Sequence, residues 1–398
     1  MSPRPPRESS GCWNASFVHS RPRLLHLHGS FSLGGKEARA VRLMNLWGDR
    51  ATHAIVSGDP TAMGARDAID PTVPVEYPDA PPLTGRPSLA RYRALSRFMS
   101  GYDLILTYNW GAMDAVMAHR LFGRSMRLPR LIHHEDGFNA DEANRLKVQR
   151  NLFRRIALTH AHALVVPSAG LEGIARQIWK QPTRRVHLIR NGIDVAAYAS
   201  TPAPDAIPNL TRSPTKLLVG TLAGLRPVKN LPRLVRAIAP HRDRLQLVII
   251  GEGPERDEIL AEAARCGLDD ICLAGFMDRP ARFVGLFDIF AFSSDSEQCP
   301  ISLVEAMAAG LPVVSTDVGD VANMVAPENR PFVVRGEAEL SAAFATLLRD
   351  EPLRARLGAA NRARAASDFA EDDMADTYAA LYDEALGRGA LAKAGNLR

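Results

Sequence analysis

The sequence contains few cysteines and no long apolar run. The four cysteines among 398 residues include no CxxC pair, which excludes a disulfide framework, a zinc finger and a thioredoxin-type site. No stretch reaches the ~18 uninterrupted apolar residues of a membrane-spanning helix. The first residues, MSPRPPRESSGCWNAS, carry prolines and arginines where a signal peptide would need an apolar core. We therefore expect a cytoplasmic protein.

The composition is that of a folded protein with an uneven distribution of charge. Hydrophobic residues make up 46% and charged residues 23% of the chain, and 398 residues suit two domains. Residues 1–212 hold 28 lysines and arginines against 17 acidic residues, a net charge of +11, whereas residues 213–398 carry −6. A basic half indicates an anionic partner, either nucleic acid or a membrane surface.

Strand-like and helical segments alternate in two series, which predicts two doubly wound parallel α/β sheets. The first series has strands near 24–28, 54–56, 104–107, 131–133 and 164–167, and helices near 36–47, 88–99, 112–121, 140–158 and 171–179. The second series begins after a proline-rich stretch that is typical of a linker. The expected organisation is a polar tail at 1–21, a domain at 22–199, a linker at 200–215, a domain at 216–367 and a closing helical segment at 368–398.

Two cations follow the first strand of the second series. In the segment 217–231, LLVGTLAGLRPVKNL, Arg226 and Lys229 stand three apart just before an expected helix. The N–H groups and partial positive charge of a helix start suit a phosphate, and the two cations add to them. The alternative is a surface turn with two solvated cations. The segment is not a Walker loop, because GxxxxGK[ST] is absent.

Two glutamates occupy the segment 288–320, DIFAFSSDSEQCPISLVEAMAAGLPVVSTDVGD. Glu297 and Glu305 are eight apart, with Pro300 between them at the expected start of a helix. Glu297 would lie in the loop and Glu305 on the helix, so that both face one crevice. Carboxylates accept hydrogen bonds from sugar diols. The alternative is that the two glutamates only favour the positive end of the helix.

Taken together, these segments resemble the retaining GT-B glycosyltransferases of family 4, the glycosyl transferases group 1. The resemblance is carried by an ordered set of motifs: Gly34-Gly35-Lys36-Glu37, Asn191-Gly192-Ile193-Asp194, the segment 224–230 (GLRPVKN), the segment 251–256 (GEGPER), the pair Glu297 and Glu305 in E-x7-E spacing, and the segments 305–314 (EAMAAGLPVV) and 316–319 (TDVG). It implies two Rossmann-like domains that face each other across a cleft, the second of which holds a nucleotide-sugar donor.

The resemblance also implies a role for each matching residue. Arg226 and Lys229 would neutralise the donor diphosphate, Glu305 would bind the ribose, and Glu297 would bind the transferred sugar. The same sugar would contact the loop Gln298, Cys299, Pro300 and Ile301. Gly34 and Gly35 would approach the diphosphate from the first domain, and Gly319 would lie in the loop beneath it.

A histidine after the strand 131–133 is a further expectation of the resemblance. His134, or its neighbour His133, would contact the transferred sugar, so that His134 joins Arg226, Lys229 and Glu297 as a candidate catalytic residue. The alternatives are a solvated strand end or a chance metal-like cluster. Glu135 and Asp136 are candidates for the acceptor side. Two other histidines, His26 and His28, occupy positions of one strand that face the same way, which favours packing.

In chemical terms, the resemblance implies a transfer without a metal or other cofactor. The leaving group is a nucleoside diphosphate, whose charge the cations and helix starts would stabilise. Retention is ascribed to attack from the face of the leaving group, so no protein nucleophile is expected. Two departures from the family pattern stand out: Gln298-Cys299 replaces the usual Gly-Phe, and Asp320 replaces the last glycine of Val-Gly-Gly. The identity of the sugar therefore cannot be carried over.

Two basic amphipathic segments, 88–99 and 145–155, can lie on an anionic membrane or be ordinary helices with their apolar stripe in the core.

We favour transfer of a hexose-type sugar from a UDP- or GDP-sugar to a lipid-linked or cell-surface polysaccharide precursor, by a cytoplasmic protein peripheral to the inner face of the membrane. The alternatives are a GT-B nucleotide-sugar isomerase and a basic nucleic-acid-binding protein. The second lacks a recognition motif, so we expect no nucleic acid. The absence of GxGxxG disfavours a dinucleotide dehydrogenase.

Overall fold

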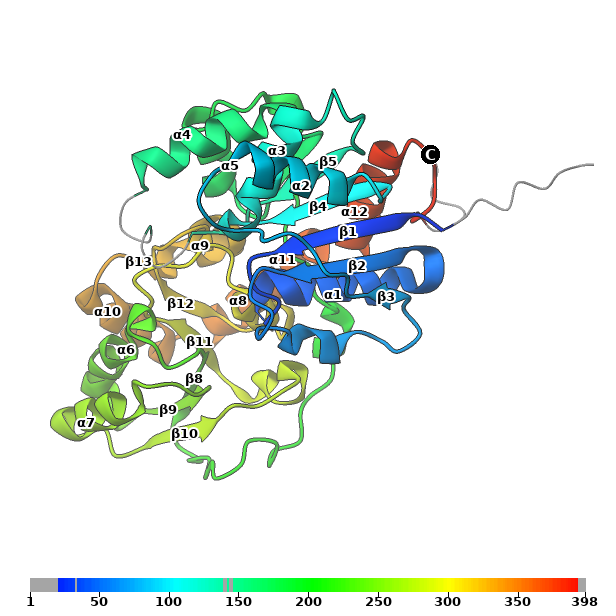
Figure 1. Ribbon diagram of the computed structural model, residues 1–398. Coiled ribbons are helices and arrows are strands. Elements are labelled where there is room, and N and C mark those ends of the chain that lie inside the picture. Colours follow the sequence, from blue (N-terminus) through cyan, green and yellow to red (C-terminus); the bar gives the residue numbers. More distant parts are fainter. Residues whose placement is uncertain (1–20, 33, 139–141, 143–145, 393–398) are drawn as a thin grey trace, which may run out of the picture.

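The chain folds into two α/β domains (Figure 1). The computed structural model describes residues 21–32, 34–138, 142 and 146–392. The first domain contains a parallel sheet in the order β3-β2-β1-β4-β5-β6-β7. Its strands are β1 (Arg23–His28), β2 (Thr52–Ser57), β3 (Val75–Glu76), β4 (Leu104–Tyr108), β5 (Leu131–His134), β6 (Ala163–Val166) and β7 (Val186–Leu188). Its helices are α1 (Gly35–Trp47), α2 (Leu89–Met99), α3 (Met113–Phe122), α4 (Val148–Ala157) and α5 (Ala169–Gln177).

The second domain repeats this plan with a parallel sheet in the order β10-β9-β8-β11-β12-β13. Its strands are β8 (Leu217–Leu222), β9 (Leu245–Ile250), β10 (Ile271–Gly275), β11 (Ile289–Phe292), β12 (Val313–Thr316) and β13 (Val333–Val334). Its helices are α6 (Leu231–Ile238), α7 (Arg256–Cys266), α8 (Ile301–Ala308), α9 (Val321–Met324), α10 (Glu337–Arg349) and α11 (Glu351–Asp368). The predicted fold, two Rossmann-like domains with parallel sheets, is confirmed.

The strands are apolar along most of their length because helices cover both faces of each sheet. In β1, Leu25 and Leu27 pack on the face that α2, α3 and α5 cover, whereas Leu24 packs on the face of α1. Strand alternation places His26 and His28 on the Leu24 side, where both are fully buried and stacked on aromatic rings. The predicted packing role of these two histidines is confirmed.

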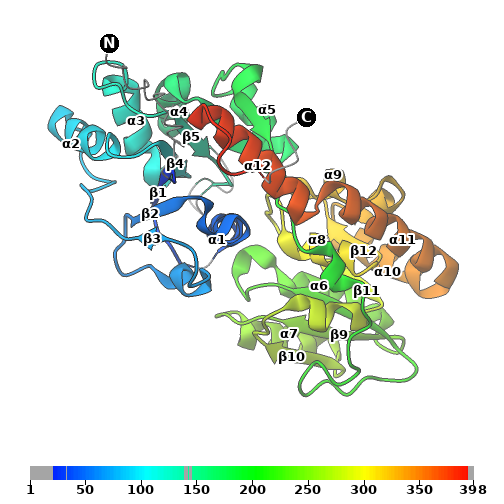
Figure 2. The same cartoon turned by 90° about the vertical axis from the view of Figure 1, so that its right-hand side faces the viewer.

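The last helix, α12 (Glu371–Leu386), returns to the first domain (Figure 2). Met374, Tyr378 and Tyr382 are buried in the same core as Trp47 of α1, and the rings of Trp47 and Tyr382 meet edge to face at 5.4 Å. Helix α12 therefore completes the core of the first domain, and the chain crosses back from the second domain to form it.

One helix is shorter than expected. The periodicity at 140–158 predicted a single helix, but the described part of this segment is helical from Val148, and residues 139–141 and 143–145 lie outside the described residues. Within the described ranges, no helix is long and apolar enough to cross a membrane.

Candidate active site

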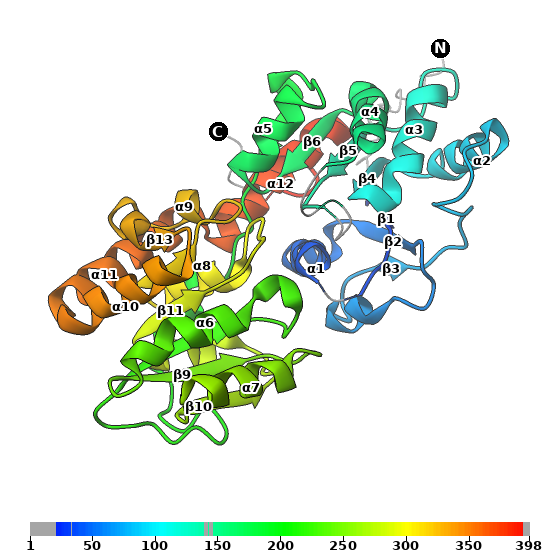
Figure 3. The same cartoon turned by 90° about the vertical axis from the view of Figure 1, so that its left-hand side faces the viewer.

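A cavity of about 1050 Å³ lies between the two domains, at the carboxyl ends of their strands. Figure 3 shows α1 of the first domain facing the side of the second domain that carries α6 and α8. The first domain lines the cavity with Gly35, Lys36, Asn109, Asp136, Gly137, Phe138 and Asn191, and the second with residues 226–229 and 295–302. Ligands of open parallel sheets bind at this edge, because the loops that follow the strands converge there.

The structure brings most of the predicted site residues together in this cavity. The lining includes Gly35, Arg226, Lys229, Glu297, Gln298, Cys299, Pro300 and Ile301. Four predicted residues are not part of that lining: Gly34, His134, Glu305 and Gly319.

Lys229 and Glu297 form an ion pair inside the cavity. The Lys229 Nζ atom lies 2.5 Å from Glu297 Oε1, and the Ser294 hydroxyl donates to the same oxygen at 2.7 Å. The Ser293 hydroxyl donates to the Lys229 carbonyl at 3.1 Å, so the two loops are also joined through the backbone. Arg226, at the start of the turn Pro227–Lys229, is exposed to the cavity. Two cations and one carboxylate thus converge within reach of one ligand.

Helix α8 begins at the cavity, directly after Pro300. Its first turn carries no acidic residue, and no side chain caps it. The N–H groups of such a helix start, together with the helix dipole, favour a negative charge. Gly319 supports this loop from below: it has φ 57°, and a Cβ atom there would lie 2.0 Å from the Glu297 carbonyl oxygen. Gly319 therefore allows close approach of two backbones and does not itself line the cavity.

Glu305 lies on α8, one turn beyond the helix start that lines the cavity, and close to Arg42 of the first domain. The hydroxyl of Tyr198 donates to its carboxylate. Burial raises the pKa of Glu305 to about 7, although the Tyr198 hydrogen bond and the nearby Arg42 oppose that shift. At neutral pH this carboxyl group is therefore poised between its two protonation states.

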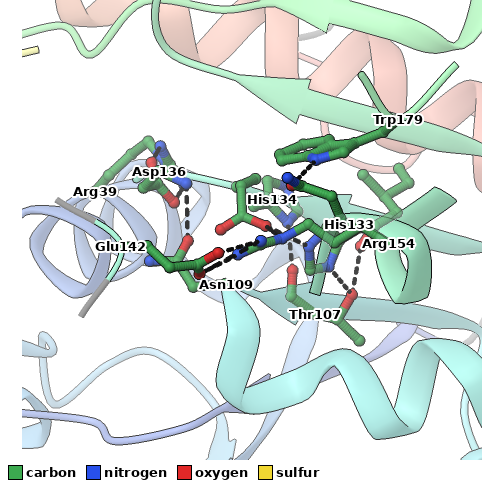
Figure 4. Close-up of polar contacts among 12 residues, drawn as sticks. Arg39, Thr107, Asn109, His133, His134, Asp136, Glu142, Arg154 and Trp179 are labelled. Atoms are coloured by element: carbon green, nitrogen blue, oxygen red, sulfur yellow. Dashed lines mark hydrogen bonds and ion pairs between the residues drawn. The ribbon is translucent and has the colours of Figure 1, made fainter. Parts of the chain in front are cut away.

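His134 does not reach the cavity, contrary to the expectation drawn from the family resemblance (Figure 4). Its Nδ1 atom lies 3.2 Å from the Thr107 carbonyl oxygen, and its Nε2 atom lies 2.8 Å from the Tyr382 hydroxyl. The side chain is fully buried on the sheet face that α12 covers. His133 is fully buried on the other face, with Nδ1 2.8 Å from the Thr107 hydroxyl. Both side chains are enclosed, His134 between the sheet and α12 and His133 on the opposite face of the sheet, and neither lines the cavity.

The metal-like cluster considered for the same segment is not formed. Within residues 21–32, 34–138, 142 and 146–392, no group of three or more histidine, cysteine and acidic side chains is arranged to hold a metal ion.

The predicted acceptor-side residue Asp136 belongs to a polar cluster of the first domain whose other members were not predicted as site residues. Asp136, an acceptor-side candidate, lines the cavity and forms a two-pronged ion pair with the buried Arg39 of α1. Arg39 also donates to Asn191 Oδ1 at 3.1 Å, and Asn109 Oδ1 accepts from the Asp136 backbone N–H at 2.7 Å. The sequence held a signal for Asn109, because it directly follows the strand β4. It held no signal for Arg39, because nothing in the sequence distinguishes this arginine from the other cations on the helices.

Both departures from the family pattern meet the first domain. The Gln298 side chain lies against Gly137, where a Cβ atom would be 3.0 Å from Gln298 Cγ. The Asp320 carboxylate accepts from the Ala169 backbone N–H at 3.1 Å. Burial raises the pKa of the Cys299 thiol to about 12, with a partial offset from a hydrogen bond to the backbone of Asn191. Gln298 and Asp320 of the second domain thus both contact the first domain.

Comparison with known proteins agrees with this geometry. Residues 33–197 match the family model Glycosyltransferase Family 4, and residues 204–364 match Glycosyl transferases group 1. A putative glycosyltransferase of Bacillus subtilis, EpsF, is 33% identical over 46% of this chain and 48% of its own. The N-acetylgalactosamine-N,N'-diacetylbacillosaminyl-diphospho-undecaprenol 4-alpha-N-acetylgalactosaminyltransferase of Campylobacter jejuni is 28% identical over 57% of this chain and 64% of its own. This chain therefore spans about half to two thirds of the length of these two relatives.

Among solved structures, Anabaena HepE in complex with UDP has a TM-score of 0.74 at 21% sequence identity, covering 91% of this chain and 100% of its own. The same protein was also solved with UDP-glucose, with a TM-score of 0.72 at 20% identity over the same shares of the two chains. The first domain is thus similar to Glycosyltransferase Family 4 and the second to Glycosyl transferases group 1, and together the two domains have the GT-B glycosyltransferase fold.

Proposed function

We propose that the protein transfers a hexose-type sugar, with retention of configuration, from a nucleoside-diphosphate sugar to a lipid-linked or cell-surface polysaccharide precursor. One observation carries the proposal: Arg226, Lys229, Glu297 and the start of α8 converge on a single cavity between the domains. A nucleotide sugar has a diphosphate for the cations and hydroxyl groups for the carboxylate.

The diphosphate would lie between Arg226, Lys229 and the N-terminal turn of α8. These groups would stabilise the negative charge that develops on the leaving nucleoside diphosphate, which is the main demand of the reaction. They supply the positive charge a metal ion would otherwise bring, so we propose no metal or other cofactor. Gly34 and Gly35 precede and open α1, where their small size would let the diphosphate approach from the first domain.

Lys229 and Glu297 would separate when the donor binds. The diphosphate would take the Lys229 ammonium, and the carboxylate of Glu297 would then accept hydrogen bonds from the transferred sugar. The loop Gln298, Cys299, Pro300 and Ile301 would contact the same sugar, since these residues line the cavity beside Glu297. Before the donor binds, the ion pair offsets part of the desolvation cost of these two partly buried groups.

The nucleoside would bind beneath this loop. We propose that Glu305 accepts from the ribose hydroxyls and that Tyr198, its present partner, yields to them. The complexes of Anabaena HepE with UDP and UDP-glucose favour a uridine nucleotide. A guanosine nucleotide is the other base that we consider.

The acceptor would enter from the first domain, where Asp136 is fixed by Arg39. Its hydroxyl would attack the anomeric carbon from the face of the leaving diphosphate, which would take the proton, so no protein nucleophile is assigned. The Campylobacter relative is named for a diphospho-undecaprenol substrate, which supports a lipid-linked acceptor. The net charge of +11 on residues 1–212 supports peripheral attachment at the inner membrane face.

The proposal is tested by ligand-induced thermal stabilisation followed by product analysis. Nucleoside diphosphates and their sugars are screened first, and the donor that raises the melting temperature is then incubated with lipid-linked acceptors. Stabilisation by UDP or GDP in the wild type and its loss in Lys229→Ala are expected. A protein stabilised by neither nucleotide, or equally in both variants, would remove the donor-site assignment.

A further inference from the structure

Helix α4 carries an apolar stripe on its outer face. Val148, Leu152 and Ile156 are four residues apart, so they lie on one side of the helix, and their exposed fractions are 74%, 56% and 46%. The helix lies on the outside of the first domain (Figure 1; Figure 3). Single apolar residues scattered over a surface are normal, whereas three large apolar side chains in a row on one helix face form a contiguous patch of the kind that marks an interaction site.

The other basic amphipathic segment, α2, does not share this property. Its Tyr92, Leu95 and Met99 are buried in the first core, and Phe98 packs on the ring of Tyr102. Only Leu89, at the first position of α2, is exposed among the apolar residues of its stripe. The ordinary-helix interpretation is therefore confirmed for α2, and the structure leaves α4 as the candidate surface.

A cluster of arginines adjoins the stripe of α4. Arg155 is exposed one position before Ile156, and Arg120 donates to the Thr159 hydroxyl at 2.8 Å, just beyond the helix. Burial lowers the pKa of the neighbouring His160, and the charges of Arg120, Arg124 and Arg185 lower it further. No acidic residue occurs in the segments 115–134 and 143–171. The surface is therefore both apolar and cationic.

The inner face of α4 packs behind the wall of the active-site cavity. The fully buried Arg154 donates to Glu135 Oε2 at 3.0 Å and lies 5.3 Å from the ring centre of Phe138, which lines the cavity. One helix diameter, ~10 Å, thus separates a surface bound to the outer face of α4 from that wall. The Arg154 and Asp136 contacts are drawn in Figure 4.

We propose that α4 is a membrane-docking surface, whose apolar stripe enters the headgroup region of an anionic bilayer while the arginines Arg120, Arg124, Arg155, Arg184 and Arg185 contact the lipid phosphates. Charge complementarity selects this occupant, because a basic helix with one apolar face matches an anionic lipid surface. The inference rests on the proposed function, and it would place a lipid-linked acceptor beside the cavity. Vesicle binding requires no turnover, so the two proposals fail separately.

The test is co-sedimentation of the full chain with vesicles of phosphatidylglycerol and phosphatidylcholine, and with phosphatidylcholine alone, at low and high salt. The wild type is expected to bind the anionic vesicles and to be released by high salt. The variant Val148→Ser/Leu152→Ser/Ile156→Ser should bind at least tenfold more weakly. Its matched control replaces three exposed apolar residues elsewhere, Leu89→Ser/Leu260→Ser/Phe276→Ser, and should bind like the wild type.

A charge variant tests the second half of the proposal. Arg124→Gln/Arg155→Gln/Arg184→Gln should also weaken binding at least tenfold, whereas Arg279→Gln/Arg349→Gln/Arg356→Gln in the second domain should not. All six arginines are exposed, so both variants should keep the wild-type melting temperature.

Three results would overturn the proposal. They are no binding of the wild type to anionic vesicles, equal binding by the serine variant of α4 and its control, and a dimer in sedimentation velocity that only the serine variant of α4 abolishes. The last result would assign the stripe to contact with a second copy of the chain.

Discussion

The carboxylate of Asp320 in the second domain accepts a hydrogen bond from the backbone N–H of Ala169 in the first domain, at 3.1 Å. Asp320 is buried, and its other oxygen accepts from the Asn323 amide at 2.8 Å. Ala169 is the first residue of α5, so the contact joins a carboxylate to the positive end of a helix. This carboxylate therefore links the two domains directly.

Removal of that carboxylate should loosen the junction between the domains. We expect Asp320→Gly to lower the free energy of unfolding by about 1–3 kcal/mol, because a buried charge-assisted hydrogen bond is lost. Chemical denaturation measures the change. Asp317→Asn, at an exposed position in the same loop, is the control and should leave stability unchanged within 0.5 kcal/mol, roughly the range of surface substitutions.

Substitutions of Lys229 and Glu297 should have different effects, one on the affinity for the nucleotide and the other on the turnover of the sugar. We expect Lys229→Ala to weaken UDP or GDP binding and to lose transfer activity at least a hundredfold, a loss of about 3 kcal/mol of transition-state stabilisation. Glu297→Gln should keep nucleoside diphosphate affinity but lower kcat. Calorimetry with the nucleotide and a steady-state assay measure the two effects. Lys216→Ala, at a surface ion pair with Asp270, is the matched control; equal loss in this control would contradict the assignment.

Glu305 should make nucleotide binding and stability depend on pH. Its pKa of about 7 in the folded chain lies above the ordinary 4.5, so between pH 4.5 and 7 the folded state holds more protons than the unfolded one. The contribution of Glu305 to the free energy of unfolding is therefore fully present below pH 4.5. It is lost as the pH rises through 7, and the loss is up to about 3 kcal/mol. Glu305→Gln should remove this slope in pH-dependent denaturation. It should also abolish the tighter nucleotide binding expected at pH 8 relative to pH 6.

The buried histidines should destabilise the protein in acid. Burial lowers the pKa of His53 to about 4 and holds the pKa values of His26, His28 and His134 well below 6.5. The unfolded chain binds these protons first, so stability falls as pH drops below 6.5, by about 1.4 kcal/mol per histidine per pH unit. Thermal unfolding between pH 7 and pH 5 measures this acid limb.

His28 offers a specific test of that acid limb. Neither ring nitrogen of His28 has a hydrogen-bond partner among the described residues, and its ring stacks 4.0 Å from that of Tyr108. We expect His28→Phe to stabilise the chain at pH 7 by about 1 kcal/mol, because two unpaired buried nitrogens are removed, and to flatten the acid limb. A destabilised His28→Phe variant with an unchanged acid limb would show that the ring geometry needs an imidazole.

The sequence alone predicted the two parallel sheets, because buried parallel strands read as short apolar runs separated by helices. It also predicted that Arg226, Lys229, Glu297 and the loop after it share one cavity, since loops that follow parallel strands meet at one edge. Glu305 was placed on the correct helix, but its burial against Tyr198 depends on a contact between segments more than a hundred residues apart.

Local sequence pattern thus determined the elements, their order and the loops that carry charge. Only the tertiary structure decided that His134 turns away from the cavity, because α12 returns from the end of the chain and supplies Tyr382 as its partner. It also decided that α2 buries its apolar stripe while α4 exposes its own, a difference set by the neighbours of each helix. Spacing in the sequence fixes which side chains share a face, but the long-range packing of the chain decides what that face meets.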